Sequence, residues 1–279
     1  MVLGLSSFLK LEDEEEGGKY RDWFLDFVRR DFGPNVFVLW NFLYEPSTTE
    51  TWLQLKDDKE VVGYVQKHFS DRWERIFVSM NGLVSEDLFL KVVGEREFLY
   101  FSVDPEHLSM VTRVFEPQGS LFYPYAGDMA CFLVMSISED RFNRCLREKE
   151  AFRLSLEDVD KWDLLKDCEM FLKYGWGFGV FEADRLVSRA FGWDFLENFA
   201  VVRDVSTLEE FRGKGYGTIV TSAVVSFAFD VMKKPSVFLW VEESNTPARK
   251  IYDKLGFKVV GKRISFDGRR ILPPPSKKQ

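Results

Sequence analysis

Residues 209–218 read EEFRGKGYGT, which places three glycines beside Arg212 and Lys214. The stretch follows a predicted strand and precedes an apolar run, IVTSAVVSFAFDVM, whose spacing predicts a long helix. The first turn of a helix offers unpaired N–H groups at the positive end of the helix dipole, and glycines let a ligand approach the main chain. The stretch therefore predicts a cradle for a phosphate group, with a tight surface turn as the alternative.

A second signal lies further along the chain, where residues 244–257 read SNTPARKIYDKLGF. Thr246 is the expected N-cap of a short helix, a proline fits the first helical position, and Gly256 ends the helix. Ala248 and Tyr252 lie four residues apart on one face, next to an apolar face. We therefore expect Tyr252 to point away from the core toward a groove, with an ordinary half-buried aromatic as the alternative.

Together the two signals resemble the GNAT superfamily of acyl-CoA-dependent N-acyltransferases, and the resemblance spans about residues 152–263. It implies that main-chain N–H groups of the glycine-rich loop hold the CoA pyrophosphate. It also implies that the preceding strand splays from the next strand and pairs with the pantetheine arm of acetyl-CoA. The residues that it assigns to binding of this co-substrate are Val205, Ser206, Thr207, Arg212, Gly213, Lys214, Gly215, Tyr216, Gly217, Thr218, Asn245 and Tyr252.

The activity that the resemblance implies is transfer of the acetyl group of acetyl-CoA to a primary amine, by direct attack in a ternary complex. The amine must be neutral to attack, so a carboxylate is expected to take its proton directly or through water. A main-chain N–H at the strand splay would hold the oxyanion, and Tyr252 would protonate the leaving thiolate. Asp204 and Glu197 are the expected bases, and Glu242 and Glu243 stay open as alternatives. This chemistry requires no metal, and we expect no metal ligands.

The two halves of the chain share an order of predicted elements: helix, hairpin, strand, helix, strand, short helix, strand. In the second half a capped helix over 155–175 precedes a hairpin. The charge-dense segment 138–152 is expected to be a helix or a connection near the domain boundary. We therefore predict a degenerate acyltransferase-like domain without the CoA loop over 1–145 and a catalytic GNAT domain over 146–279. The expected fold class is mixed α/β, each domain a twisted, mostly antiparallel sheet flanked by helices, with splayed central strands in the second.

Composition excludes several functional classes. The chain has 279 residues, of which 46% are hydrophobic and 28 are Phe, so material for a folded core is plentiful. A net charge of −7 argues against nucleic-acid binding. Three cysteines and two histidines are too few for a disulfide framework, a zinc ligand set or a histidine-based triad. We see no signal peptide and no apolar run of the roughly 20 residues that span a bilayer, so we expect a cytoplasmic protein without a membrane partner.

Two further functions stay open at this stage. A non-catalytic acyl-CoA-binding sensor or scaffold would keep the glycine-rich loop but would not turn over substrate. A transferase of a different acyl or aminoacyl group would keep both the loop and catalytic turnover. The acceptor is expected to be an amine on a small molecule, a peptide or a protein, and the chain is expected to be a monomer or a homodimer.

Overall fold

The computed structural model describes residues 5–11, 17–30, 32–57, 60–70, 74–119, 128–196 and 198–271. The chain forms two compact units, of which unit 2 is Leu133–Val260 and unit 1 takes the residues before it and after it. Strands β7 (Ala130–Ser138) and β13 (Lys258–Arg270) each begin in one unit and end in the other. The boundaries between the units therefore fall inside strands, rather than in the charge-dense connection where the sequence places the division at residue 145.

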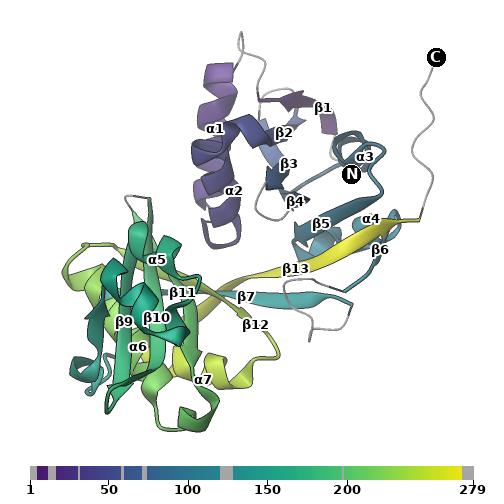
Figure 1. Ribbon diagram of the computed structural model, residues 1–279. Coiled ribbons are helices and arrows are strands. Elements are labelled where there is room, and N and C mark those ends of the chain that lie inside the picture. The colour runs from purple at the N-terminus through teal and green to yellow at the C-terminus, as the bar shows by residue number, and fades with distance from the viewer. Residues whose placement is uncertain are drawn as a thin grey trace. The chain divides into compact units, whose positions relative to one another are not determined.

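Unit 1 is built around a sheet in the order β1-β2-β3-β4-β5-β13, with β6 beside β13 (Figure 1). Its neighbouring strands are antiparallel except β4 and β5, which are parallel. The strands are β1 (Leu5–Lys10), β2 (Thr49–Lys56), β3 (Glu60–Ser70), β4 (Arg75–Gly82), β5 (Phe98–Val103) and β6 (Phe115–Pro117). The helices and 3-10 turns are α1 (Gly17–Arg30), α2 (Phe32–Tyr44), η1 (Pro46–Thr48), α3 (Glu86–Val93), η2 (Pro105–His107) and α4 (Leu108–Thr112).

Helices cover both faces of the sheet in unit 1. Tyr64 and Val65 are neighbours on β3, so their side chains point to opposite faces. The Tyr64 ring packs edge-on against Phe24 of α1, with 5.6 Å between ring centroids. Val65 belongs to a buried cluster with Leu88 and Phe89 of α3. Helices α1 and α3 therefore bury the two opposite faces.

Unit 2 has its strands in the order β7-β12-β11-β10-β9-β8, and β11 and β12 are parallel. Its further strands are β8 (Phe152–Leu154), β9 (Gly175–Glu182), β10 (Arg185–Leu196), β11 (Phe199–Thr207) and β12 (Ser236–Glu242). Its α-helices are α5 (Glu169–Lys173), α6 (Tyr216–Asp230) and α7 (Thr246–Leu255). Its 3-10 turns are η3 (Glu139–Arg141), η4 (Glu148–Glu150), η5 (Leu156–Lys161), η6 (Asp163–Leu165) and η7 (Glu209–Phe211).

The sheet of unit 2 is also covered on both faces. Ala190 and Phe191 are neighbours on β10, and their side chains point to opposite faces. Ala190 belongs to the buried cluster around α6, which packs on β9, β10 and β11 (Figure 1). Phe191 stacks on Phe171 of α5 at 5.1 Å. The long helix that begins at the glycine-rich loop is thus fixed to the centre of the sheet.

Residues 155–175 do not form the single capped helix that the sequence predicts; they form η5, η6 and the short α5. Ser155 does cap the first turn, in a capping box with Asp158. Trp162 then takes an extended conformation, and its ring packs edge-on against Phe181 at 5.2 Å. Packing of this tryptophan on β9 outweighs the local helical preference.

The two units repeat one crossover. In unit 1 the chain leaves β4, forms α3 and returns as β5 parallel to β4. In unit 2 it leaves β11, forms α6 and returns as β12 parallel to β11. Together with the antiparallel strands on either side, this confirms the mixed α/β fold and the order of elements that the two halves of the sequence share. No helix of the described chain combines the length and the apolar composition that a bilayer crossing requires.

Candidate functional site

Strands β11 and β12 separate after a short parallel ladder. They pair over three positions, which begin with Phe199 opposite Ser236 and end with Val201 opposite Phe238. Beyond these pairs both strands continue, and residues 202–207 of β11 have no ladder partner on β12. The predicted splay is therefore present, and it leaves one main-chain edge of β11 with which an extended ligand could pair.

A β-bulge interrupts β11 at Asp204. Arg189 of β10 pairs with Ser206 and Phe191 pairs with Arg203, so β11 holds one extra residue between these pairs. Asp204 has a φ of +48°, in the left-handed region that few residues other than glycine adopt. Arg189 Nη1 donates to the carbonyl oxygen of Asp204 at 3.2 Å and to its Oδ2 at 2.5 Å. The predicted base therefore lies at the bulge, held there by a cation.

Cys168, at the N-terminal end of α5, lies beside this pair. Its thiol is buried, and Sγ is 3.8 Å from Asp204 Oδ2. Burial raises the pKa of Cys168 to about 11; the Arg189 guanidinium opposes this rise and the Asp204 carboxylate adds to it. The thiol is therefore protonated at neutral pH.

We expect the stabilising contribution of Cys168 to be lost as pH rises from 9 to 11. The unfolded chain releases the thiol proton near the ordinary value of 9.0, whereas the folded chain keeps it up to about 11. The contribution of Cys168 to stability is therefore fully present below pH 9 and falls through this window, by about 2 kcal/mol. The measurement is urea unfolding of the wild type and of Cys168→Ala at pH 8 and pH 11. The stability difference between the two proteins should shrink at pH 11, and a difference that stays constant would contradict the prediction.

The glycines of the loop have two different roles. Gly213 and Gly215 take φ values of +80° and +85°, which glycine adopts without strain. A Cβ added at Gly213 would meet nothing within 4 Å, and one at Gly215 would meet Arg147 Nη1 at 4.0 Å. At Gly217 a Cβ would lie 2.8 Å from Ile251 Cδ1, so this glycine lets α6 pack against α7. The first two glycines therefore keep the main chain open, and the third serves packing.

Main-chain N–H groups at the start of α6 lack acceptors. Within the described chain, no residue accepts a hydrogen bond from the N–H groups of residues 213–217. The N–H of Thr218 donates to the carbonyl of Gly215 at 3.0 Å, so this predicted ligand group is engaged inside the first turn. Residues 212–215 are exposed. The helix thus presents unpaired donors next to an open loop, which is the arrangement that binds phosphate.

The predicted side chains of the loop differ in their exposure. Arg212 is exposed, and its Nε donates to the carbonyl of Thr207 at 3.3 Å. Lys214 is exposed, and its Nζ lies 4.8 Å from the centre of the Phe211 ring. Tyr216 is buried in the core cluster, so of this residue only the main chain can serve a ligand. Two cations therefore stand at the rim of the loop.

The three predicted arm residues lie at the end of β11. Val205 follows the bulge and has no ladder partner on β10. Ser188 Oγ donates to the carbonyl of Ser206 at 3.1 Å and lies 2.8 Å from Thr207 Oγ1. These bonds engage the edge of β11 that faces β10. The opposite edge, which faces β12, is therefore the edge that a ligand could pair with.

Asn245, and not Thr246, caps α7. Asn245 Oδ1 accepts the N–H of Ala248 at 3.2 Å, and Thr246 is the first residue of the helix. The sequence expectation of a threonine cap is therefore wrong by one residue. Asn245 was expected to bind acetyl-CoA, and its side-chain oxygen serves the cap instead.

Tyr252 lies inside the core. It is 6% exposed, belongs to the cluster around α6, and packs edge-on against Phe257 with ring centroids 5.9 Å apart. The expectation that it points away from the core is wrong, because the apolar face of α7 is broad enough to include it. Burial raises the pKa of Tyr252 to about 12, so its hydroxyl keeps its proton at neutral pH. Of the remaining candidate bases, Glu197 lies outside the described residues and Glu242 accepts a hydrogen bond from Ser244.

The comparison with known families agrees with this geometry. Residues 177–265, which include the splay, the bulge and the loop, match the FR47-like protein family. The match agrees with the resemblance of this part of the chain to the GNAT superfamily. An N-alpha-acetyltransferase of Sulfurisphaera tokodaii is 39% identical over 59 residues, which are 21% of this chain and 35% of that protein. The chain therefore matches about a third of the length of that relative.

Solved structures extend the fold similarity to nearly the whole chain. A tandem GNAT protein from the clavulanic acid biosynthesis pathway covers 96% of this chain and 99% of its own, with a TM-score of 0.59 and 14% identity. A GCN5-related N-acetyltransferase from Kribbella flavida covers 75% of this chain and 88% of its own, with a TM-score of 0.54 and 13% identity. At this level of identity the similarity is one of fold: this chain has the tandem GNAT fold.

A hollow of about 470 Å³ in unit 2 touches Leu208, directly after β11. Its other walls come from η5, η6 and the start of β10. The charged side chains that line it are Asp160, Lys161, Asp163, Lys166, Asp167 and Arg185. Their mixed charges suit a small polar molecule better than an apolar one.

The connecting segment, residues 139–150, lies along α6 as a chain with two 3-10 turns, and not as a helix. The N–H of Cys145 donates to Ser222 Oγ at 2.9 Å. The Glu148 carboxylate accepts from Ser222 Oγ at 2.8 Å and from Ser226 Oγ at 2.6 Å. These bonds tie the segment to the polar side of α6. The sequence analysis recognised the charge density of this segment but not its contacts.

Replacing Glu148 by alanine is expected to lower the free energy of unfolding by about 2 kcal/mol, since it leaves two buried serine hydroxyls without their acceptor. Urea unfolding followed by circular dichroism measures the change. Glu150→Ala is the matched control, because Glu150 lies in the same turn and pairs with an exposed arginine. The control should leave the unfolding midpoint nearly unchanged, and equal effects of the two variants would contradict the prediction.

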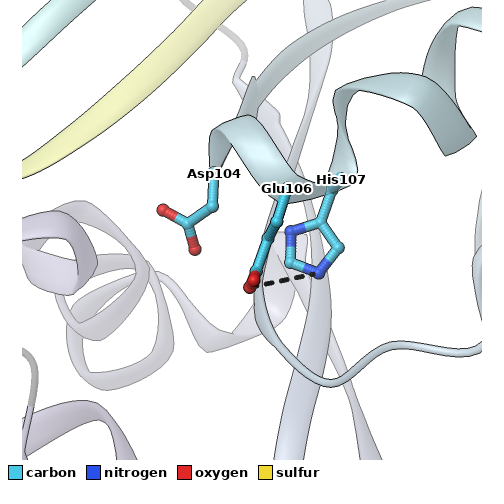
Figure 2. Close-up of side chains that lie close together, drawn as sticks. All are labelled: Asp104, Glu106 and His107. Atoms are coloured by element: carbon cyan, nitrogen blue, oxygen red, sulfur yellow. Dashed lines mark ion pairs between the residues drawn. The ribbon is translucent and has the colours of Figure 1, made fainter.

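In unit 1, Asp104, Glu106 and His107 bring possible metal-ligand atoms within 4.8 Å of one another (Figure 2). His107 Nε2 is 2.8 Å from the carbonyl of Gly82. Asp104 accepts from the buried Arg263 at 3.1 Å. Because this guanidinium neutralises Asp104, a cation would be attracted chiefly by the exposed Glu106. The group is therefore better explained as a partner of Arg263, and the absence of a metal stays a prediction.

At the matching crossover of unit 1, from β4 to α3, protein groups accept hydrogen bonds from part of the main-chain N–H groups of the described chain. The N–H of Leu83 donates to the carbonyl of Val62 at 2.8 Å. The N–H of Ser85 donates to Gln54 Oε1, and the N–H of Leu88 to Ser85 Oγ, both at 3.2 Å. The N–H groups of Val84, Glu86 and Asp87 are left without an acceptor among the described residues, so this crossover leaves fewer such groups open than the five of residues 213–217 in unit 2.

Proposed function

We propose that the GNAT domain transfers the acetyl group of acetyl-CoA to a primary amine. The observation that carries this proposal is the free edge of β11 followed, a few residues later in the chain, by the unpaired N–H groups of residues 213–217. An acyl-CoA can bind both features. Its amide-bearing arm can pair with a strand edge, and its diphosphate can accept hydrogen bonds from a helix N-terminus. The open space in front of Gly213 and Gly215 fits a ligand that approaches the main chain closely.

The residues that would bind the diphosphate are Gly213, Lys214, Gly215, Tyr216 and Gly217 through their N–H groups, with Arg212 and Lys214 adding positive charge. Val205, Ser206 and Thr207 would pair with the arm. Asn245 and Thr218 have a smaller part in this proposal than the sequence suggests, because the Asn245 side chain caps α7 and the Thr218 N–H is engaged.

Acetyl-CoA supplies the acetyl group as a thioester, and the protein must stabilise the sulfur that leaves. Tyr252 is a weak acid here, with a pKa of about 12 against about 8.5 for an ordinary thiol. Complete proton transfer from Tyr252 to the thiolate would be uphill. We therefore assign Tyr252 the role of a hydrogen-bond donor to the sulfur, and the bulge at Asp204 the role of turning a main-chain N–H toward the reacting carbonyl.

The acceptor that fits best is an α-amine. The Asp204 carboxylate is already engaged in an ion pair with Arg189. An acceptor that is partly neutral near pH 7 depends least on a strong base. An α-amino group, with a pKa of about 7.7–8.0, meets this condition better than a lysine near 10.4. The relative named N-alpha-acetyltransferase points to the same class of acceptor.

Unit 1 is assigned as a degenerate GNAT-like domain without a CoA site. Its crossover from β4 to α3 has no glycine-rich loop, and protein groups accept from several of its N–H groups. In this proposal the catalytic and degenerate parts correspond broadly to the predicted domains over 146–279 and 1–145.

The test is thiol release from acetyl-CoA by the full chain, with three acceptors: a peptide with a free α-amine, the same peptide with a blocked α-amine and one lysine, and a polyamine. The expected result is the highest kcat/KM for the free α-amine. The buried Tyr252 and the paired Asp204 favour one alternative, a CoA-binding sensor or scaffold without turnover. CoA binding without thiol release on any acceptor would support that alternative and overturn the enzyme.

A further inference from the structure

Arg147 of the connecting segment stands at the mouth of the glycine-rich loop. Its Nη1 donates to the carbonyl of Lys214 at 3.3 Å and lies 4.0 Å from the position of a Cβ on Gly215. Its Nε and Nη2 both donate to the Glu150 carboxylate at 2.8 Å. One edge of the guanidinium is thus held by Glu150, and Nη1 is directed at the loop.

The main chain on either side of Arg147 is anchored to α6. Cys145 bonds to Ser222, and Glu148 bonds to Ser222 and Ser226. The arginine is therefore presented by a fixed segment, so less conformational freedom is lost when it binds a ligand than for an arginine on a free loop. This placement is independent of the glycine-rich motif, since Arg147 and Lys214 are 67 residues apart in the sequence.

We propose that Arg147 is a further binding residue for the diphosphate of the acyl-CoA. The diphosphate site would then have three cationic side chains: Arg147, and Arg212 and Lys214 of the glycine-rich motif. The proposal rests on the proposed function. Arginine donates through several N–H groups in a plane, which suits phosphate oxygens. Nη1 exchanges its bond to a neutral carbonyl for a bond to a charged oxygen, while Glu150 keeps the guanidinium in place. In a chain with a net charge of −7, a local cluster of cations is what makes this mouth attractive to an anion.

The test is isothermal titration of CoA into the full chain and into Arg147→Gln. The expected result is about tenfold weaker binding by the variant, the effect of losing a charge-assisted bond at an exposed site. Arg144→Gln is the matched control. Arg144 lies in the same segment, and its side chain is 44% exposed against 51% for Arg147. It pairs with Asp230 at the other end of α6 and with Glu148, which stays bonded to Ser222 and Ser226 when Arg144 is replaced. The control removes the same charge and should change CoA affinity less than about twofold.

Dephospho-CoA, which keeps the diphosphate and lacks the 3′-phosphate, locates the contact. The tenfold effect of Arg147→Gln should persist with this ligand, and its disappearance would overturn the assignment to the diphosphate. If the wild type binds CoA and Arg147→Gln binds it equally well, the inference on Arg147 falls and the proposed function stands. If the wild type itself does not bind CoA, the proposed function falls. Arg147→Lys, which keeps the charge and loses the planar fork, should lie between the wild type and Arg147→Gln.

Discussion

Replacing Gly215 by valine is expected to raise the Kd for CoA by about a hundredfold or more. A β-branched residue at a φ of +85° is strained, and relief of this strain would move the N–H groups that the diphosphate needs. The new side chain would also project into the open space through which a ligand reaches the main chain. Strain of 1–3 kcal/mol and the loss of one or two hydrogen bonds together amount to about this factor.

Isothermal titration of CoA measures this effect, and Gly94→Val is its matched control. Gly94 ends α3 in unit 1, has a φ of +53°, and a Cβ added there would also meet nothing within 4 Å. The control therefore also places a β-branched residue at a positive φ, far along the chain from the loop, and it should leave CoA affinity unchanged. A folded Gly215→Val protein that binds CoA like the wild type would show that the cradle lies elsewhere.

Replacing Tyr252 by phenylalanine is expected to reduce kcat by about a hundredfold while the Kd for acetyl-CoA stays the same. The phenyl ring keeps the packing against Phe257, so the change removes the hydroxyl and little else. Loss of a donor to developing charge in a buried site costs about this factor. Steady-state thiol release gives kcat, and titration with acetyl-CoA gives the affinity.

Tyr100→Phe controls for the loss of a buried tyrosine hydroxyl as such. Tyr100 is 7% exposed, close to the 6% of Tyr252, and lies on β5 of unit 1. Its replacement should leave kcat unchanged. An unchanged kcat in Tyr252→Phe would remove the tyrosine from the mechanism and leave the sulfur to be stabilised by another donor.

The parts of the site that could be predicted from the sequence depend on local chemistry. The positions of Gly213 and Gly215, the strand before them and the helix after them follow from glycine's access to positive φ and from hydrophobic spacing. The separation of β11 from β12 also agrees with the prediction, which was based on the resemblance to the GNAT superfamily. Local sequence and family pattern therefore suffice for the frame of the site.

The parts that could not be predicted depend on distant contacts. Arg147 reaches the loop from a segment far away in the sequence, so no spacing rule could place it there. Tyr252 was expected on an open face, and the breadth of the core around α6 decides that it is buried. Trp162 breaks the predicted helix over 155–175 because Phe181 offers it a packing partner. In each case a tertiary contact outweighs or supplements the local pattern.

The late return of the chain to its first unit has a consequence for biosynthesis. Strand β5 pairs with the final described strand, β13, from Phe98 opposite Arg269 to Val103 opposite Ile264. A ribosome must therefore translate the whole of unit 2, which lies between β5 and the paired residues of β13 in the sequence, before the edge of β5 is covered. The topology thus requires a chaperone to protect the exposed edge of β5 during synthesis. Products that end at a premature stop codon upstream of β13 keep this edge exposed and must be degraded.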